Sequence, residues 1–529
     1  MRSASTSATV VLALALLQPA TASPALPARN DLAWVLEAYR SAQGVWAPGR
    51  PQTRSFQWTI VQGGLRGTET HIVSGSDERI DTTLGPSTQA EGTLGGVSWS
   101  MNANAEVVVD SGIHRSLAID DAALRAATGA RGPTRGVRLA GHVLRPVDEY
   151  DVQVDPPGGV LEDLYINART WTLDRRVVRY PGHTVMYAYD DYRTTLGIRF
   201  AWHVHESIDG GRQEIDLRLQ DVALGSPVDP SRLAMPQSRS IVSFAKPRSS
   251  LPGEIVGDRI IIPVQIGSRT VNLQLDSGAS GIAIDRGIVR ALGYAEYGRV
   301  TEETAGPYVE SSAVIPSIVI GPLTMHDVHV ESIPFGSLAG NYPIAGLLGF
   351  DFIDCVVLHI DYADGTVEAI DPNAFTQPAG TVSLPIALDD GVPAIAARIG
   401  SASGLRFLVD TGADRSMLFS SFAKNHANVM LDRGLGTEME AASPFVGHLE
   451  GVGGRIQYRP VQLGPLTVAS WTFSRWLFYM TLDPSSFEIQ DYDGILGQDL
   501  LRYYDLYLDY PHRRILFAPN ARYAERFAP

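Results

Sequence analysis

Two short segments of the sequence place an aspartate between an apolar run and a turn of small residues. Asp276 is followed by Ser277-Gly278-Ala279, and Asp410 is followed by Thr411-Gly412-Ala413. The glycines allow a tight turn or a close approach to another backbone. One aspartate in such a place is commonly only a turn residue. Two carboxyl groups held close together would behave differently, because both cannot ionise cheaply; they would share a proton and could act as an acid and a base.

A third copy of the short motif shows how little it means alone. Val107-Val108-Val109 leads into Asp110-Ser111-Gly112, but the next residues are Ile113 and His114 rather than a small pair. No later segment matches those that follow the other two motifs. We therefore interpret Asp110 as the turn of a β-hairpin.

The other two motifs belong to a longer internal repeat. Further matches follow in the same order, and each copy ends in two strand-like runs. The matched pairs are Pro263–Gly267 with Ala396–Gly400, Ile318–Thr324 with Val461–Thr467, Gly346–Phe352 with Gly494–Leu500, Val356–Tyr362 with Leu506–Tyr510, and Thr366–Ile370 with Arg514–Phe517. A repeat of this kind predicts two similar β lobes. The alternative is two tandem β domains that share no site.

These paired motifs, each with a later Leu-Leu-Gly or Ile-Leu-Gly, resemble the retropepsin-like and pepsin-like aspartic peptidases, and more closely the bacterial retropepsin-like branch. The resemblance covers residues 253–520. It implies that each lobe is a small β barrel and that Asp276 and Asp410 meet across a pseudo-two-fold axis as the catalytic pair. It also implies roles for the neighbours: Ser277, Gly278, Thr411 and Gly412 would hold the loops, and Leu347–Gly349 and Ile495–Gly497 would support them from beneath.

The resemblance implies hydrolysis of a peptide or protein substrate by an activated water, with no covalent intermediate, no metal and no cofactor. Because both aspartates lie in one chain, we expect an active monomer. A relative that binds peptides without cleaving them is the first alternative. In lobe two, Asp414 stands where lobe one has Ser280, and we expect it to point to solvent or to Arg415.

A glycine-rich segment in lobe two is a candidate flap over the substrate. Leu449–Arg455 contains Gly451, Gly453 and Gly454, which suit a mobile hairpin tip. An ordinary tight turn explains these glycines equally well. The corresponding segment of lobe one is less distinct and lies near Thr304–Ser312.

The composition of the chain bears on its partners and on its cysteine chemistry. The chain has 529 residues, 44% of them hydrophobic and 19% charged, with a formal net charge of −15. Such an acidic protein repels phosphate backbones, so we expect no nucleic-acid partner. Its one cysteine, Cys355, cannot form an intrachain disulfide, and we expect a buried thiol.

The first residues are typical of a cleaved signal peptide, residues 1–22. Arg2 is followed by the apolar run Val10–Leu17 and by small residues at Ala20 and Ala22. We expect an exported protein, periplasmic or secreted, with no integral membrane segment after signal removal.

The sequence after residue 22 predicts a mostly β protein. A helix is expected over Asp31–Ser41, because its apolar residues recur at helical spacing. The predicted parts are an N-terminal β domain (30–236) with a curved antiparallel sheet and a helix, a Ser-, Arg- and Pro-rich linker (237–252), and two pseudo-symmetric lobes (253–378 and 379–524).

The N-terminal domain loosely resembles periplasmic lipoprotein-carrier half-barrels, which bind apolar groups. The resemblance rests on Tyr150–Val154, Leu164–Asn167, Tyr189–Arg193 and Leu196–Phe200. A lipophilic-ligand carrier is therefore the second alternative. The domain could equally bind substrate, inhibit as a pro-segment, or dock on the lobes.

Two segments that contain histidine are not predicted to be sites of chemistry. His203 and His205 share one face of a strand-like run, and without a visible third ligand we expect a solvated strand face rather than a metal site. His359, in the apolar run that ends lobe one, is expected to be a hydrogen-bonded structural histidine.

Overall fold

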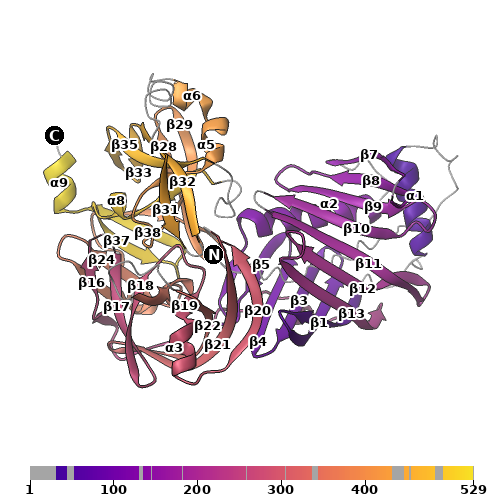
Figure 1. The fold of residues 1–529 in the computed structure, drawn as a ribbon, viewed down its shortest axis with the longest axis horizontal. Coiled ribbons are helices and arrows are strands. Elements are labelled where there is room, and N and C mark those ends of the chain that lie inside the picture. The colour runs from indigo at the N-terminus through magenta and orange to yellow at the C-terminus, as the bar shows by residue number, and fades with distance from the viewer. Residues whose placement is uncertain are drawn as a thin grey trace. The chain divides into compact units, whose positions relative to one another are not determined.

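The computed structural model describes residues 31–527 except 45–52, 130–134, 145, 181–182, 258, 304–305, 336–343, 432–445, 452–453 and 483–491. The predicted signal peptide, residues 1–22, lies outside the described residues. The described chain forms two compact units (Figure 1). The N-terminal unit comprises residues up to Ala103 and Val107–Gln237, and the C-terminal unit comprises Asn104–Glu106 and the chain from Ser238 onward.

The N-terminal unit is one antiparallel sheet with helices α1 (Leu32–Gln43) and α2 (Gly112–Gly129). Its strands are β1 (Thr53–Gln62), β2 (Leu65–Ser74), β3 (Asp77–Leu84), β4 (Ser87–Leu94), β5 (Val97–Met101), β6 (Val107–Val109), β7 (Val137–Val143), β8 (Glu149–Val154), β9 (Leu161–Asn167), β10 (Leu173–Tyr180), β11 (His183–Thr195), β12 (Ile198–Ile208) and β13 (Gln213–Leu224). The sheet runs β6-β5-β4-β3-β2-β1-β13-β12-β11-β10-β9-β8-β7. Every strand therefore pairs with a neighbour in sequence, except that β1 meets β13.

Helix α1 confirms the helix expected over Asp31–Ser41. Asp31 caps it, since its carboxylate accepts a hydrogen bond from the Trp34 amide at 2.8 Å. Val35, Leu36 and Tyr39 are buried, and they join residues of the sheet in one hydrophobic core. No helix within the described ranges is long and apolar enough to span a membrane.

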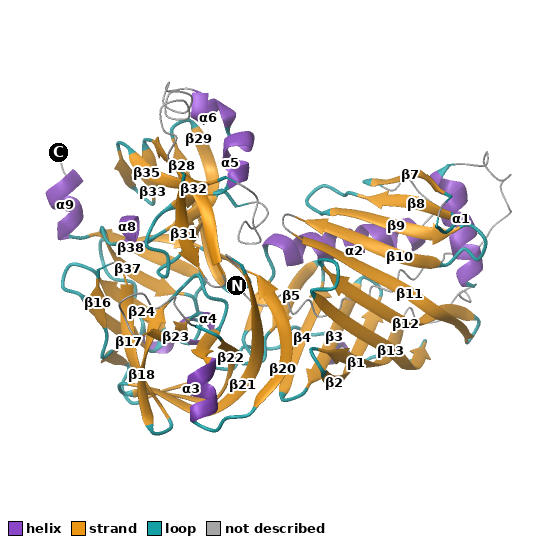
Figure 2. Cartoon of the chain, viewed as in Figure 1, coloured by secondary structure: helices purple, strands orange, loops and turns teal. Residues whose placement is uncertain are grey.

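The C-terminal unit contains two lobes and a sheet that both lobes share (Figure 2). Lobe one contains β14 (Val242–Phe244), β16 (Glu254–Val256), β17 (Arg259–Ile266), β18 (Arg269–Leu275), β19 (Ile282–Asp285), β20 (Glu296–Glu303), β21 (Pro307–Ile320), β22 (Leu323–Ile333), β23 (Ile344–Leu348), α3 (Arg286–Ala291) and α4 (Phe350–Ile353). Lobe two contains β27 (Ala387–Asp389), β28 (Val392–Ile399), β29 (Ala402–Val409), β30 (Met417–Leu418), β31 (Gly447–Gly451), β32 (Gly454–Leu463), β33 (Leu466–Val468), β34 (Trp471–Phe473), β35 (Trp476–Thr481), β36 (Gly494–Leu496), α5 (Ser420–Asn425), α6 (Ala427–Leu431) and α8 (Gln498–Leu501). The C-terminal helix is α9 (Ala521–Phe527), and a 3₁₀ turn spans Pro372–Ala374. Another 3₁₀ turn, Pro230–Arg232, belongs to the N-terminal unit.

The repeat in the sequence corresponds to a repeat in strand pairing. β18 pairs in parallel with β23, and β29 pairs in parallel with β36. β23 also pairs antiparallel with β19, as β36 does with β30. In turn β19 runs parallel to β22, and β30 runs parallel to β35. The fold is therefore mostly β with two pseudo-symmetric lobes, as predicted.

The segment 237–252 is not a free linker. It contains β14, which pairs with β22, and β15 (Arg248–Ser250), which pairs with β25 (Thr366–Ile370). Both are edge strands, and edge strands tolerate the proline and polar residues that suggested a linker. Composition alone could not distinguish an edge strand from a flexible connection here.

Strands from both lobes build a central sheet in the order β15-β25-β24-β37-β38-β26. Besides β15 and β25, this sheet contains β24 (Val357–Asp361), β26 (Val382–Pro385), β37 (Tyr504–Asp509) and β38 (Arg514–Pro519). The lobes meet where Leu358 to Asp361 pair with Leu508 to Asp505. Backbone hydrogen bonds therefore join lobe one directly to lobe two.

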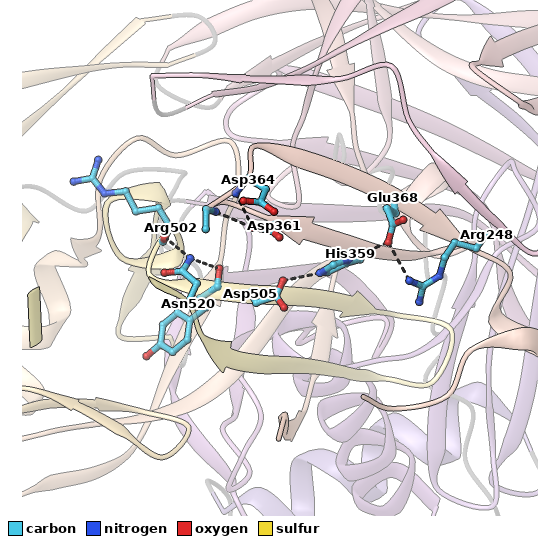
Figure 3. A network of polar contacts seen from close by, with 10 residues as sticks. Arg248, His359, Asp361, Asp364, Glu368, Arg502, Asp505 and Asn520 are labelled. Atoms are coloured by element: carbon cyan, nitrogen blue, oxygen red, sulfur yellow. Dashed lines mark hydrogen bonds and ion pairs between the residues drawn. The ribbon is translucent and has the colours of Figure 1, made fainter. Parts of the chain in front are cut away.

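His359 lies at this junction and is hydrogen-bonded on both ring nitrogens (Figure 3). Nδ1 is 3.1 Å from Glu368 Oε2, and Nε2 is 2.6 Å from Asp505 Oδ1. The ring also stacks on Tyr507 with centroids 4.2 Å apart. Burial lowers the pKa of His359, but the hydrogen bonds to the two carboxylates outweigh it and the pKa is raised above 6.5. The predicted structural histidine thus bridges the two lobes.

We expect His359→Phe to remove a pH-dependent part of the stability. A histidine whose pKa is raised on folding stabilises the protein fully below its unfolded pKa and less as the pH rises through the folded value. Below pH 6.5 the variant should therefore be less stable by about 1 kcal/mol, since phenylalanine keeps the stacking but loses the ion pairs. Thermal unfolding between pH 5 and 9 measures this difference. Parallel curves for the two proteins would contradict it.

Candidate active site

Asp276 and Asp410 occupy equivalent places in the two lobes. Asp276 directly follows β18, which pairs with β23, and Asp410 directly follows β29, which pairs with β36. The Asp276 amide donates to Leu348 O at 3.1 Å, and the Asp410 amide donates to Leu496 O at 3.0 Å. These bonds hold the start of each loop against β23 or β36. β23 and β36 therefore fix the backbone positions of Asp276 and Asp410.

The glycine of each loop lies against the carboxyl group of the other loop. A Cβ at Gly278 would lie 2.5 Å from Asp410 Cγ, and a Cβ at Gly412 would lie 2.3 Å from Asp276 Cγ. Real Cβ atoms do not approach other atoms so closely, so only glycine fits at either position. Each carboxyl group is thus packed against the loop that carries the other.

Ser277 and Thr411 bind each other's loops. The Ser277 amide donates to Thr411 Oγ1 at 3.0 Å, and the Thr411 amide donates to Ser277 Oγ at 2.9 Å. Each hydroxyl donates in turn to the opposite strand, Ser277 Oγ to Val409 O at 2.8 Å and Thr411 Oγ1 to Leu275 O at 3.1 Å. Both side chains are almost fully buried, with exposed fractions of 1% and 0%. The four bonds lock the two loops together.

Thr411→Val should destabilise the C-terminal unit because it keeps the shape of the side chain but removes the hydroxyl. The Ser277 amide and the Leu275 carbonyl would then be buried without a partner. We expect a loss of about 2–6 kcal/mol in the free energy of unfolding, the sum for two such groups. Thr411→Ser is the matched control, because it keeps the hydroxyl and should lose about 1 kcal/mol or less. Chemical denaturation measures both, and an equal loss in both variants would count against the bonds as the cause.

The carboxyl groups accept unequal numbers of backbone hydrogen bonds. Asp276 Oδ1 accepts from the Gly278 amide at 2.8 Å, whereas Asp410 Oδ1 accepts from Gly412 at 2.7 Å and from Ala413 at 3.0 Å. Burial and the charge of Asp410 raise the pKa of Asp276 well above its usual range. Burial also raises the pKa of Asp410, but its amide bonds and its hydrogen bond with Asp276 oppose that rise. If the pair holds one proton, the second amide bond at Asp410 favours the negative charge there and the proton on Asp276.

Two glutamines that the sequence did not single out reinforce the loop of lobe two. Gln274 Nε2 donates to Gly412 O at 3.0 Å, and Gln498 Nε2 donates to Thr411 O at 2.7 Å. Both are buried. The available signal was a polar residue at a position where the other copy is apolar: Leu408 corresponds to Gln274, and Phe350 corresponds to Gln498.

A second pair of acids supports the far ends of the loops. Asp351 Oδ2 accepts from the Ile282 amide at 3.1 Å in lobe one. Asp499 Oδ1 accepts from the Ser416 amide at 2.8 Å and from the Ser416 hydroxyl at 2.7 Å in lobe two. Burial raises the pKa of Asp499 to about 6, although the Ser416 bonds oppose the shift. These acids lay inside the matched segments Gly346–Phe352 and Gly494–Leu500, but sequence alone assigned them no role.

Each lobe has a hairpin in the region predicted for a flap (Figure 1). β31 and β32 form an antiparallel pair that ends where Gly451 pairs with Gly454, and Gly453 lies outside the described residues. In lobe one, β20 and β21 pair up to Glu303 with Pro307. The predicted hairpins are present, and their role over a substrate stays a prediction.

Two other expectations concern residues outside the aspartate pair. Asp110 is not a hairpin turn, since it connects β6 to helix α2; the sequence after it continues as a helix that the short motif did not reveal. Asp414 is exposed to solvent, as expected, and its carboxylate lies 3.9 Å from Arg259 Nε.

The histidine and cysteine candidates are engaged in other contacts. His203 lies between two carboxylates, 2.8 Å from Asp190 and 2.6 Å from Asp216. Within the described ranges no group of three or more metal-ligating side chains could hold a metal ion. Cys355 is buried, and its Sγ contacts Glu106 Oε1 at 3.6 Å.

Comparison with protein families identifies one segment of the chain. Residues 262–352 match the aspartyl protease family. This match includes Asp276 and the supporting segment Leu347–Gly349. No curated protein is similar enough to the chain to count as a match. The protease-like fold of the C-terminal unit thus agrees with the aspartyl protease match.

Three solved structures show a weak similarity to parts of the chain. An aspartic proteinase from Irpex lacteus is 12% identical, covers 52% of this chain and 98% of its own, and has a TM-score of 0.31. A domain described as an outer membrane lipoprotein-sorting protein, from Vibrio parahaemolyticus, is 10% identical, covers 37% and 95%, and has a TM-score of 0.27. A DUF1329 family protein from Desulfovibrio piger ATCC 29098 is 10% identical, covers 38% and 95%, and has a TM-score of 0.28.

Proposed function

We propose that the chain is an aspartic endopeptidase in which Asp276 and Asp410 activate a water molecule for attack on a peptide bond. The observation that supports this most strongly is the reciprocal packing of each carboxyl group against the glycine of the opposite loop. Such packing serves no evident structural purpose, because it brings two like charges together. It is useful if the two groups must share one proton.

The unequal hydrogen bonding suggests how the work is divided. Asp410, which accepts two amide bonds, holds the negative charge and would take a proton from the attacking water. Asp276, which keeps the proton to higher pH, would donate it to the carbonyl oxygen as charge develops there. The proton taken by Asp410 would then pass to the leaving amine as the tetrahedral intermediate breaks down. Ser277 and Thr411 hold the loops and do not react.

The substrate class follows from this chemistry. A peptide chain in extended form presents the carbonyl to the pair, and the β20–β21 and β31–β32 hairpins are candidates to close over it. Because one chain supplies both carboxyl groups, a monomer suffices. The signal-like first residues support action in an exported compartment, periplasmic or secreted.

Incubation of the purified protein with a reduced, denatured protein mixture from pH 3 to 8, followed by mass spectrometry of the peptides, tests this function. We expect cleavage that requires one protonated and one ionised carboxyl group and therefore declines at both ends of the pH range. Asp110→Asn is the matched control, since it alters the same Asp-Ser-Gly motif at a place outside the pair, and it should cut like wild type. Tight peptide binding without any cleavage would instead support the non-cleaving alternative.

A further inference from the structure

The two supporting acids of the loops are held differently. In lobe two, the hydroxyl of Ser416 donates to Asp499 at 2.7 Å. The equivalent residue of lobe one is Ile282, whose amide reaches Asp351 but whose side chain has no hydroxyl. Asp351 is nevertheless buried, with an exposed fraction of 4%. A buried carboxyl group needs further hydrogen bonds, and lobe one must obtain them from somewhere else.

A segment distant in the sequence lies against lobe one and brings a second carboxyl group to Asp351. Asn104–Glu106 lies between β5 and β6 in the sequence but belongs to the C-terminal unit. The Asn104 side chain binds the backbone of His329 on β22, accepting from its amide at 2.8 Å and donating to its carbonyl at 3.0 Å. The Ala105 carbonyl accepts from the Arg239 amide at 2.9 Å. These bonds fix the three-residue segment against lobe one.

Glu106 ends this segment with its side chain against α4. Its exposed fraction is 1%, and its carboxyl group hydrogen-bonds that of Asp351. Cys355 Sγ also lies 3.6 Å from Glu106 Oε1. Burial and the charge of Asp351 raise the pKa of Glu106 well above its usual range. A protonated Glu106 can donate to Asp351, which is what the Ser416 hydroxyl does for Asp499.

We propose that Glu106 is a positioning residue for the loop that carries Asp276, and that it replaces in lobe one the hydroxyl that Ser416 supplies in lobe two. Asp351 transmits the effect: it accepts the Ile282 amide, and its neighbour Phe350 donates its amide to Ala279 O at 3.0 Å. Both contacts lie within six residues of Asp276 in the sequence. The effect of Glu106 on catalysis rests on the proposed peptidase function.

The surroundings of Glu106 make the bond sensitive to pH. Three acidic groups of α4 and its C-terminal end, Asp351, Asp354 and Cys355, act on Glu106. Arg513 offsets the charge of Asp354 through an ion pair. His329 is coupled to Asp351 from β22, and Glu331 on the same strand lies near Gly281 together with Asp351. Ionisation of Glu106 would add a negative charge to a site with only this one cation close by among the described contacts, so the bond to Asp351 should fail as the pH rises.

The sign of the stability change follows from linkage. A carboxyl group whose pKa is higher in the folded chain stabilises the fold fully below its unfolded pKa, near 4.5, and loses that stabilisation as the pH rises through the folded value. Glutamine in place of Glu106 can donate to Asp351 at every pH. Glu106→Gln should therefore remove this part of the pH dependence, whereas Glu106→Ala should remove the bond itself.

The test compares these two variants in the full-length protein by kcat as a function of pH and by thermal unfolding as a function of pH. We expect Glu106→Ala to lower kcat by about 10–100-fold, because the loop loses its position by a fraction of an Å to 1 Å. Glu106→Gln should retain kcat within about threefold and extend activity to higher pH. Two matched controls apply: Ser416→Ala removes the equivalent bond in lobe two and should resemble Glu106→Ala, and Glu69→Gln alters an equally buried glutamate of the N-terminal unit and should leave kcat unchanged.

The outcomes separate the two proposals. If wild type cleaves and Glu106→Ala keeps its kcat and pH profile, the positioning role is overturned while the peptidase function stands. If wild type cleaves nothing at any pH, the peptidase function fails, and thermal unfolding alone decides the bond. In that case a Glu106→Gln curve that rises above wild type as the pH increases from 4.5 supports the bond to Asp351, and coincident curves overturn it.

Discussion

Asn in place of Asp276 or Asp410 is expected to lower kcat/KM by at least about 10³-fold, since asparagine keeps the shape of the side chain but cannot take or give a proton. The double variant should lose little more than either single variant, because the pair acts as one unit and fails when either member is gone. Peptide release from a denatured substrate, measured for all three variants at the pH optimum of wild type, tests both statements.

The same variants should remain folded, which separates loss of chemistry from loss of structure. Each substitution removes one of two neighbouring acids whose pKa values are raised by burial, so the repulsion between them at neutral pH disappears. We expect the Tm at pH 7 to equal or exceed that of wild type. A single variant with more than about a tenth of the wild-type rate would refute the shared-proton pair, since acid–base catalysis contributes at least about 10²-fold.

Alanine at Gly412 or Gly278 should have the next largest effect. The new methyl group would lie 2.3 Å from Asp276 Cγ or 2.5 Å from Asp410 Cγ, so the loop, the carboxyl group or both must move. Overpacking of this kind costs about 1–3 kcal/mol, and a displacement near 1 Å costs about 10²-fold in rate. We therefore expect a loss of both stability and kcat, in contrast to the asparagine variants.

Gly141→Ala is the matched control for these substitutions. Nothing lies within 4 Å of a Cβ at this position, which is in β7 of the N-terminal unit. It should leave kcat unchanged. Activity of Gly412→Ala or Gly278→Ala within about threefold of wild type would mean that the two carboxyl groups do not need their present separation, because misplacement by 1 Å should cost far more.

Much of the architecture could be predicted because the sequence repeats itself. Two of the matched segments meet in equivalent contacts: each Asp loop packs against the other, and Leu348 and Leu496 accept the amides of Asp276 and Asp410. Local patterns also sufficed for α1, whose apolar spacing and Asp31 cap are visible in a few residues. Repetition and short-range periodicity therefore carried the prediction.

The features that the sequence did not predict depend on contacts between residues far apart in the chain. Glu106 lies 249 positions before Cys355, which it contacts, and no local pattern marks it as a partner of α4. β14 and β15 have the composition of a linker and become strands only because β22 and β25 offer free edges. Gln274 and Gln498 have apolar counterparts in the other copy, Leu408 and Phe350, so the repeat does not mark them as part of the site.

The route of the chain between its two units limits how the protein can be divided. Within the described ranges the chain crosses from one unit to the other after Ala103, after Glu106 and after Gln237. A truncated protein that begins at Ser238 would therefore lack three residues that bind β22, α4 and the Arg239 amide, and it would leave Asp351 without its carboxyl partner. The C-terminal unit is discontinuous in sequence, so no fragment that starts at Ser238 contains all of its residues.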